Sequence, residues 1–421
     1  MSLKRVGGTA IIYAVSNGVG AAAQLLLILY CAYVLPGSAL GILTLFSAIV
    51  ALATQMLGLG LVAAFQRDFF TAQADARRKQ LSSVVWAVVG AGGALLLLVC
   101  VLLPIVGYDS QALPSGLVVT ALAGALGQAL QQFLLVTWQS EGKSATYARY
   151  MLGICILQVI VPMTFLQMVG HDWESAVYGQ ALVFIFGGGY SLVVLRSLGY
   201  LQFSVDRAYL RQALGFSLPL VPYQLAGWGM AMLDRFIITS FCGVAIAGYY
   251  ALAFQVAQVL NILSGGFTQA FTPWLYALLA RRDVRANGQI AIVVIGYAGG
   301  MMAMCLLGYL SFSVAVDILA KESYQQALVF APWLFLAMLF NGLYRVASSF
   351  VLFYGKTAML ALVLGAVAVL SCGLNYLFVP VYGAIASGWI VAFSFGLLFA
   401  TTSLMVVKRR GGQTALGAHQ C

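Results

Sequence analysis

Long apolar runs fill almost the whole sequence, and short polar segments separate them. One run reads ALLLLVCVLLPIV over residues 94–106, and comparable runs recur as far as residue 407. Only 8% of the 421 residues are charged, whereas a soluble domain carries about 25% charged residues. The runs are continuous, without the alternation of a transmembrane barrel. We therefore predict an all-α integral membrane protein.

The lengths of the runs predict the number of helices. A membrane-spanning helix needs about 20 apolar residues, so the chain has room for about twelve such helices with short connections. We place them at 9–34, 39–64, 82–106, 114–139, 149–169, 174–195, 213–241, 246–271, 288–314, 325–352, 357–379 and 383–407.

Basic residues gather in alternate loops. Of the 21 lysines and arginines, 18 fall on one side of the predicted topology, Lys321 falls on the other, and Arg235 and Arg345 lie inside predicted helices. This bias supports an even number of helices and places both termini in the cytoplasm. The net charge of +10 is thereby explained by topology, and no nucleic-acid partner is needed.

The two halves of the sequence resemble each other weakly. A shift of 207 residues aligns Gly8 with Gly215, Gly20 with Gly227, Gly41 with Gly248 and Gly58 with Gly265. We predict two six-helix bundles, in domains 1–200 and 201–421. Because six is even, both would start on the same side and be related by a pseudo-two-fold axis along the membrane normal, with a central cavity between them.

Polar side chains recur at helical spacing inside several predicted helices. Such residues are costly in a membrane, and they usually face a bundle interior or a water-filled cavity. Interhelical hydrogen bonding is the structural alternative. The candidate substrate-binding polar residues are Asn17, Gln24, Gln224, Gln255, Gln258 and Asn341.

Three charged residues inside predicted helices are a sharper signal. Asp234 and Arg235 lie in LPLVPYQLAGWGMAMLDRFII (218–238), and Arg345 lies in the helix at 325–352. A guanidinium can bind phosphate oxygens two at a time, so Arg235 and Arg345 are candidate sites for an anionic substrate group. A buried structural ion pair is the other interpretation of Asp234 and Arg235, and Asp234 is the candidate for coupling to H⁺ or Na⁺.

The sequence contains no pattern typical of an enzyme. It has two histidines, His171 and His419, and no Ser-His-Asp set, paired carboxylates or metal-ligand cluster. The glycine clusters GAGG (90–93) and GGG (187–189) lie inside apolar runs, where close helix packing explains them better than phosphate binding. We predict neither catalysis, cofactor nor metal.

Several motifs point to one family. The segment 214–276 contains Leu-Pro, Asp-Arg, Gly-Tyr-Tyr and an aromatic-Pro ending, and ILAKESYQQA (318–327), YGKT (354–357) and VPVYGAIASGWIVAFSFGLL (379–398) follow. With these motifs the chain resembles the polysaccharide flippases of the multidrug/oligosaccharidyl-lipid/polysaccharide exporter superfamily. The resemblance covers nearly the whole chain.

The resemblance implies a two-lobed transporter with a cationic cavity open to one side at a time. It implies flipping of polyprenyl-pyrophosphate-linked oligosaccharide from the cytoplasmic to the periplasmic leaflet of the bacterial inner membrane, for O-antigen, capsule or exopolysaccharide synthesis. Expected partners are this lipid-linked oligosaccharide, membrane lipids, a coupling H⁺ or Na⁺, and polysaccharide polymerase and chain-length proteins. The alternatives are a drug/cation antiporter of the same superfamily and a membrane-embedded glycan polymerase.

Overall fold

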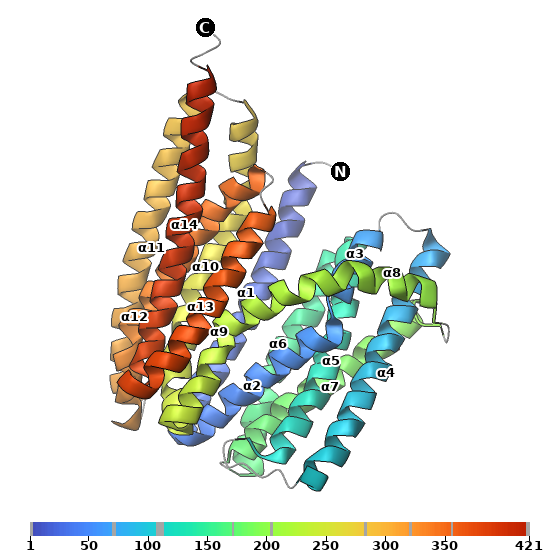
Figure 1. The fold of residues 1–421 in the computed structure, drawn as a ribbon. Coiled ribbons are helices and arrows are strands. Elements are labelled where there is room, and N and C mark those ends of the chain that lie inside the picture. The colour runs from blue at the N-terminus through green and yellow to red at the C-terminus, as the bar shows by residue number, and fades with distance from the viewer. Residues whose placement is uncertain are drawn as a thin grey trace. The chain divides into compact units, whose positions relative to one another are not determined.

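The computed structural model of the chain is all-helical over the part that it describes, which is residues 3–69, 73–106, 113–170, 172–202, 205–281, 284–319, 322–354 and 357–417 (Figure 1). The helices of its first half are α1 (Leu3–Val34), α2 (Gly37–Gly58), α3 (Leu61–Phe69), α4 (Ala74–Val106), α5 (Ser115–Ser140), α6 (Ser144–Met168), α7 (Trp173–Ser197) and α8 (Arg207–Ser217). Those of the second half are α9 (Val221–Cys242), α10 (Val244–Arg281), α11 (Val284–Leu319), α12 (Ala327–Phe353), α13 (Thr357–Tyr382) and α14 (Ile385–Gly417), with short 3₁₀ segments at Leu218–Leu220 and Glu322–Gln326.

Ten helices of the described residues are long and apolar enough to cross a membrane. They are α2, α4, α5, α6, α7, α10, α11, α12, α13 and α14. The prediction of an all-helical membrane protein is therefore confirmed, and ten of the twelve predicted segments each fall on one helix. The predicted helix at 213–241 corresponds to α9, which is not among the ten and carries Gln224, Asp234 and Arg235.

Two predicted helices are interrupted in the structure. The helix expected at 39–64 ends at Gly58, because Leu59 (φ 42°) and Gly60 (φ 70°) take left-handed backbone conformations before α3 begins. The helix expected at 213–241 is divided at Leu218–Leu220, where Pro219 and Pro222 remove backbone donors. Each interruption separates a long helix from a short amphipathic one: residues 59–60 separate α2 from α3, and residues 218–220 separate α8 from α9.

The chain forms two compact units, Met1–Trp228 and Gly229–Cys421, which divide inside α9. In the first unit α5 is the central helix and packs against α2, α4, α6 and α7. In the second unit α12 is central and packs against α10, α11, α13 and α14. The predicted domains 1–200 and 201–421 stay a prediction.

The outward faces of peripheral helices are apolar, as a lipid environment requires. On α11 the exposed side chains include Ile292, Ile295, Leu306 and Leu307, and α4 shows the same character at Leu97 and Ile105. The buried faces of α5 and α12 are built from Phe133, Leu134, Phe330 and Leu334. Apolar residues thus cover both the inside and the outside of each unit, and polar groups in the interior become the informative ones.

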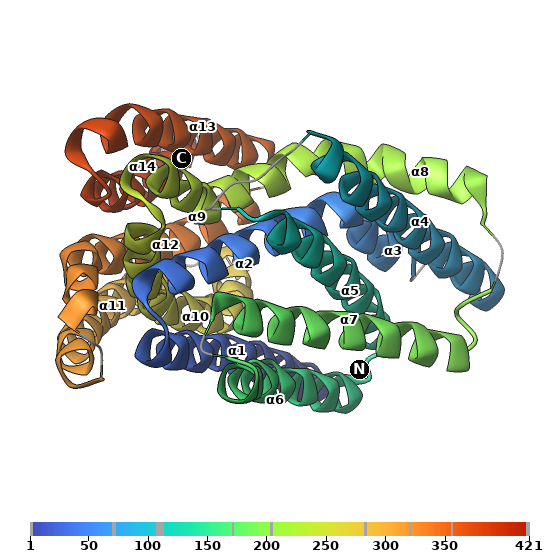
Figure 2. The ribbon, with the colours of Figure 1, turned by 90° about the horizontal axis from the view of Figure 1, so that it is seen from below.

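Glycine allows α5 and α7 to approach closely, and Figure 2 shows both helices from below. A Cβ on Gly188 would lie 2.6 Å from the Cα of Gly127, and one on Gly127 would overlap the carbonyl of Phe184. Beside this crossing, Gln131 Nε2 donates to the Phe184 carbonyl at 3.0 Å. Gln131 therefore makes an interhelical hydrogen bond, and the glycines are packing residues.

The GGG segment allows a matched test of this packing. Gly188→Ala is expected to lower the free energy of unfolding by about 2–3 kcal/mol, because the backbone of α5 cannot move away without loss of contacts. Gly189→Ala should be neutral or stabilising by up to about 1 kcal/mol, because alanine is the better helix former and no atom lies within 4 Å of its Cβ. Thermal unfolding of both variants in detergent measures the difference, and equal melting temperatures would contradict the assigned helix crossing.

Candidate functional site

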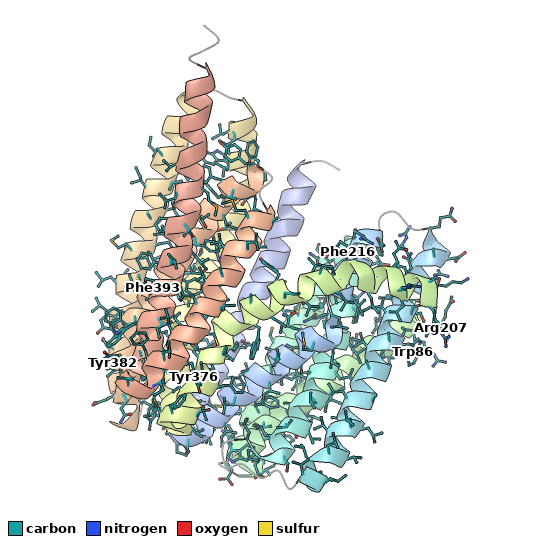
Figure 3. All side chains as sticks on the ribbon, viewed as in Figure 1. Trp86, Arg207, Phe216, Tyr376, Tyr382 and Phe393 are labelled. Atoms are coloured by element: carbon teal, nitrogen blue, oxygen red, sulfur yellow. The ribbon has the colours of Figure 1, made fainter. Side chains whose placement is uncertain are left out.

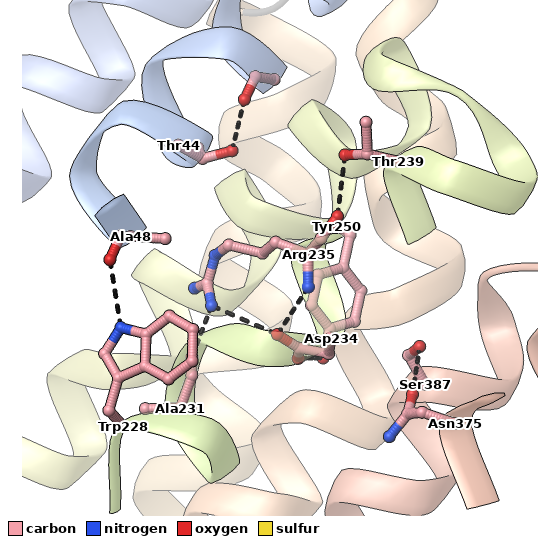
Figure 4. A network of polar contacts seen from close by, with 11 residues as sticks. Thr44, Ala48, Trp228, Ala231, Asp234, Arg235, Thr239, Tyr250, Asn375 and Ser387 are labelled. Carbon is pink, nitrogen blue, oxygen red and sulfur yellow. Dashed lines mark hydrogen bonds and ion pairs between the residues drawn. The ribbon is translucent and has the colours of Figure 1, made fainter. Parts of the chain in front are cut away.

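Asp234 and Arg235 form a buried cluster on α9 (Figure 4). Each side chain is about 4–5% exposed, and Arg235 Nη1 lies 3.4 Å from Asp234 Oδ1. The backbone N–H of Arg235 donates to the same carboxylate oxygen at 2.9 Å, and Arg235 Nη1 also donates to the Ala231 carbonyl. The adjacent acid and base therefore do pair, through a side chain that folds back along its own helix.

Helix α10 supplies two further partners to this cluster. The hydroxyl of Tyr250 donates to Asp234 Oδ2 at 2.5 Å, and Tyr250 is fully buried. The guanidinium of Arg235 lies over the ring of Phe254, 4.5 Å from its centroid. Tyr250 belongs to the Gly-Tyr-Tyr motif that sequence reasoning used only as a family signature. The spacing of residues in an apolar run does not show which acidic side chain a tyrosine such as Tyr250 will contact.

The surroundings of Arg345, on α12, are different. Its Nε is buried and has no hydrogen-bond partner, and no ion pair to its guanidinium occurs among the residues that the structure describes. A Cβ at Gly265 of α10 would stand 3.6 Å from Arg345 Nη1, so the glycine leaves room beside the guanidinium. Arg345 is half-buried, and a charge partly withdrawn from water without a partner is costly, which makes this position a candidate binding site for an anion.

A chain of side-chain amides lies next to Arg345. Asn341, one turn before Arg345 on α12, donates through Nδ2 to Asn261 Oδ1 at 3.1 Å. Asn261 in turn donates to Gln258 Oε1 at 2.7 Å. The predicted site residues Asn341, Gln258 and Arg345 are thus gathered along the contact between α10 and α12, and Asn261 joins them.

Helix α11 closes the third side of this region. The hydroxyl of Tyr297 donates to Ser264 Oγ at 2.7 Å. A Cβ on Gly342 would lie 2.8 Å from the Tyr297 oxygen and 3.2 Å from Ser264 Oγ, so only glycine allows α12 to approach so closely. Helices α10, α11 and α12 together hold the polar residues around Arg345 in place.

The two arginines occupy separate levels of one helix face. Their contacts on α10 are Phe254 for Arg235 and Gly265 for Arg345. Positions 254, 258, 261 and 265 follow helical spacing and share a face, and eleven residues correspond to a rise of roughly 16 Å. The structure therefore brings both arginines to α10 but keeps their contacts about three turns apart.

The remaining predicted site residues are less closely grouped. Gln255 is half-buried on α10, and Gln224 is half-buried on α9, where its Nε2 would lie 3.3 Å from a Cβ at Gly60. Gln24 is exposed, and the side chain of Asn17 lies outside the described residues. Among the described residues no group of three His, Cys, Asp or Glu side chains could hold a metal ion.

Comparison with known structures defines the class of fold. The chain is similar over 96% of its length to an inward-facing multidrug resistance MATE family transporter of the MOP superfamily, with 17% identity, 99% of that chain covered and a TM-score of 0.75. An outward-facing structure of such a transporter gives 16% identity, coverage of 97% and 96%, and a TM-score of 0.65. A mutant of the Vibrio cholerae MATE transporter VcmN gives 16% identity, coverage of 96% and 98%, and a TM-score of 0.62. The fold is that of the MATE transporters across the full chain.

Sequence comparison identifies the family. Residues 6–279 match the family described as polysaccharide biosynthesis protein, so the chain belongs to that family. No curated sequence matches at a significant level. The predicted resemblance to a polysaccharide family is therefore confirmed, and the fold is like that of MATE transporters.

Proposed function

We propose that the protein is a flippase that moves polyprenyl-diphosphate-linked oligosaccharide across the membrane by alternating access. The observation that carries this proposal is half-buried Arg345, whose Nε is buried without a hydrogen-bond partner and whose guanidinium has no acidic partner in the described residues. A diphosphate would supply the missing negative charge, since guanidinium binds phosphate oxygens in pairs. Membership of a polysaccharide biosynthesis family supports a glycan as the cargo.

Arg345 is the better candidate of the two arginines for the diphosphate. Arg235 already has a carboxylate, a backbone carbonyl and an aromatic ring as partners. The separation of roughly 16 Å along α10 is larger than a diphosphate group can bridge. In this proposal Arg345 binds the diphosphate, and Asn341, Asn261 and Gln258 bind hydroxyl groups of the sugar attached to it.

The wider arrangement is proposed from the sequence. Twelve spans in two six-helix bundles would be related by a pseudo-two-fold axis along the membrane normal, with both termini in the cytoplasm of a bacterium and the glycan delivered to the periplasm. The same proposal includes coupling to H⁺ or Na⁺ through Asp234. It also includes transfer of the flipped glycan to polymerase and chain-length proteins for O-antigen or exopolysaccharide synthesis.

Transport of a defined substrate tests the function. The purified protein would be reconstituted in vesicles containing a fluorescent polyprenyl-diphosphate-linked glycan, and a membrane-impermeant quencher would report the fraction in the outer leaflet over time. We expect protein-dependent translocation that protein-free vesicles lack. Failure to move the glycolipid, together with efflux of a cationic dye driven by a H⁺ or Na⁺ gradient, would identify a drug/cation antiporter instead.

The antiporter is the second candidate because the similar solved structures include multidrug resistance transporters. The charges argue against it. A cationic drug needs an available carboxylate, but Asp234 is already paired with Arg235 and Tyr250. The unpaired charge at Arg345 would repel such a ligand.

A further inference from the structure

Three segments of the N-terminal unit with exposed polar faces pack together. They are the short helices α3 and α8, which are not candidate spans, and the first turns of the candidate span α4. Asp206 is the N-cap of α8, and its carboxylate accepts hydrogen bonds from the N–H groups of Ala208 and Tyr209 at 3.0 and 3.1 Å. The helix turns Tyr209, Ala213 and Ser217 inward and leaves Arg207 and Arg211 exposed. We call the assembly of residues 61–69, 74–83 and 207–217 the amphipathic platform.

The linker before α8 is fastened to α4. Ser82 Oγ and Trp86 Nε1 both donate to the Gln202 carbonyl, the latter at 2.9 Å, and the Asp206 N–H donates to Ser83 Oγ at 2.7 Å (Figure 3 labels Trp86 and Arg207). Tyr200 donates to Glu141 at 2.7 Å, and burial followed by this carboxylate raises the pKa of Tyr200 to about 12. The platform is therefore held rigidly on the unit.

Two arginines of the platform are used internally. Arg67 pairs with Asp68 at 2.6 Å and lies over the ring of Phe216, 4.0 Å from its centroid. The hydrogen bond to Asp68 raises the pKa of Arg67 further above its usual range. Arg77 lies over the ring of Phe69 at 4.9 Å. These contacts fasten α3 to α8 and to the start of α4.

Four basic side chains of the platform point into solvent. Lys79, Arg207 and Arg211 are exposed and make no ion pair within the described part of the chain. Arg78 is exposed as well; its ion pair there is with the exposed Asp75, at 4.0 Å, and its guanidinium stands beside Gly199. Because Arg207 and Arg211 are four residues apart, they share one face of α8. Helices α4 and α8 are in contact, and the Asp206 N–H bonds to Ser83 beside this contact. The basic side chains at the start of α4 (Arg78 and Lys79) and those on α8 (Arg207 and Arg211) therefore lie on neighbouring segments.

The position of the platform on α4 indicates what these charges meet. Towards its C-terminal end α4 exposes Leu97, Leu102 and Ile105, which is the surface expected against lipid tails. Trp86 lies between that apolar surface and the basic turn, as tryptophan does at membrane interfaces. Lys79 is seven residues from Trp86, or roughly 10 Å along the axis. This order along α4 is the one expected when the basic side chains lie at the depth of lipid headgroups.

We propose that the amphipathic platform binds the headgroups of anionic membrane lipids through Arg78, Lys79, Arg207 and Arg211. Basic clusters directly beside a span attract anionic headgroups. Bound lipid would anchor α8 to the interface at the point where the chain passes into α9. The inference does not depend on the proposed transport function.

Stabilisation by added lipid tests the proposal. The purified protein in neutral detergent is titrated with phosphatidylglycerol, phosphatidylcholine or inorganic phosphate, and its melting temperature is recorded at low and high salt. We expect phosphatidylglycerol alone to raise the melting temperature, in a salt-sensitive manner. In the double variant Arg207→Gln/Arg211→Gln the apparent affinity for phosphatidylglycerol should fall by about 25-fold.

Arg149→Gln is the matched control, because Arg149 is exposed in the same unit but outside the platform. It should keep the wild-type response to phosphatidylglycerol. An equal response to phosphatidylcholine, or equal losses in the control and the double variant, would overturn the proposal. Stabilisation by inorganic phosphate to the same extent would show a general anion site and would also overturn it. If the double variant has a lower melting temperature without lipid, the test is still the apparent affinity for phosphatidylglycerol, which the titration measures separately for the variant and the wild type.

Discussion

Arg345→Ala is expected to lower transport of a polyprenyl-diphosphate-linked glycan by at least about 100-fold, because two charge-assisted hydrogen bonds to the diphosphate are lost. Arg345→Lys keeps the charge but loses the paired donors, so a smaller loss of about tenfold is expected. Initial rates in reconstituted vesicles measure both effects.

The stability of the same variants separates binding from structure. Because Arg345 Nε is buried without a partner and no described carboxylate pairs with the guanidinium, its removal takes away a half-buried charge that no acidic group compensates. The melting temperature of Arg345→Ala should therefore equal or exceed that of the wild type. A marked fall in melting temperature together with wild-type transport per folded molecule would contradict a role in substrate binding. Arg149→Ala, an exposed arginine of the other unit, should change neither quantity.

Unlike Arg345→Ala, the variant Asp234→Asn is expected to lower the stability of the protein, destabilising the C-terminal unit by about 3–5 kcal/mol. The substitution keeps the size of the side chain but leaves the Arg235 guanidinium buried without its carboxylate. Thermal unfolding in detergent would record a lower melting temperature. Tyr250→Phe removes one hydrogen bond to Asp234 and should cost about 1–3 kcal/mol.

A double-mutant cycle tests whether Asp234 and Arg235 act as a pair. The combined variant Asp234→Asn/Arg235→Gln should be destabilised by clearly less than the sum of the single variants, because neither charge is then left alone. Additive losses would contradict the ion pair. If Arg235→Gln abolished transport and left the melting temperature unchanged, Arg235 would be a binding residue, and the assignment of the diphosphate to Arg345 alone would be wrong.

The two interrupted helices show what local patterns predict poorly. The apolar run at 39–64 continues past Gly58, and hydrophobicity gives no reason for the helix to end there. The left-handed conformations of Leu59 and Gly60 end it, and α3 then packs against α8. Pro219 and Pro222 explain why the predicted helix at 213–241 is divided, but the apolar pattern does not indicate that the residues before them form a separate helix at Arg207–Ser217.

The sequence by itself determined the class of protein. Long apolar runs leave a chain no stable alternative to membrane helices, and a charge inside such a run is costly wherever it lies, so Asp234, Arg235 and Arg345 were recognisable as special. Their roles were decided by tertiary structure, because the cost of a buried charge depends on its partners. Tyr250 and Phe254 come from α10 to complete the cluster of Asp234 and Arg235, whereas the guanidinium of Arg345 lies beside Gly265 of α10 and has no acidic partner in the described residues. Those partners are distant in sequence, and only the packing of α9, α10 and α12 brings them together.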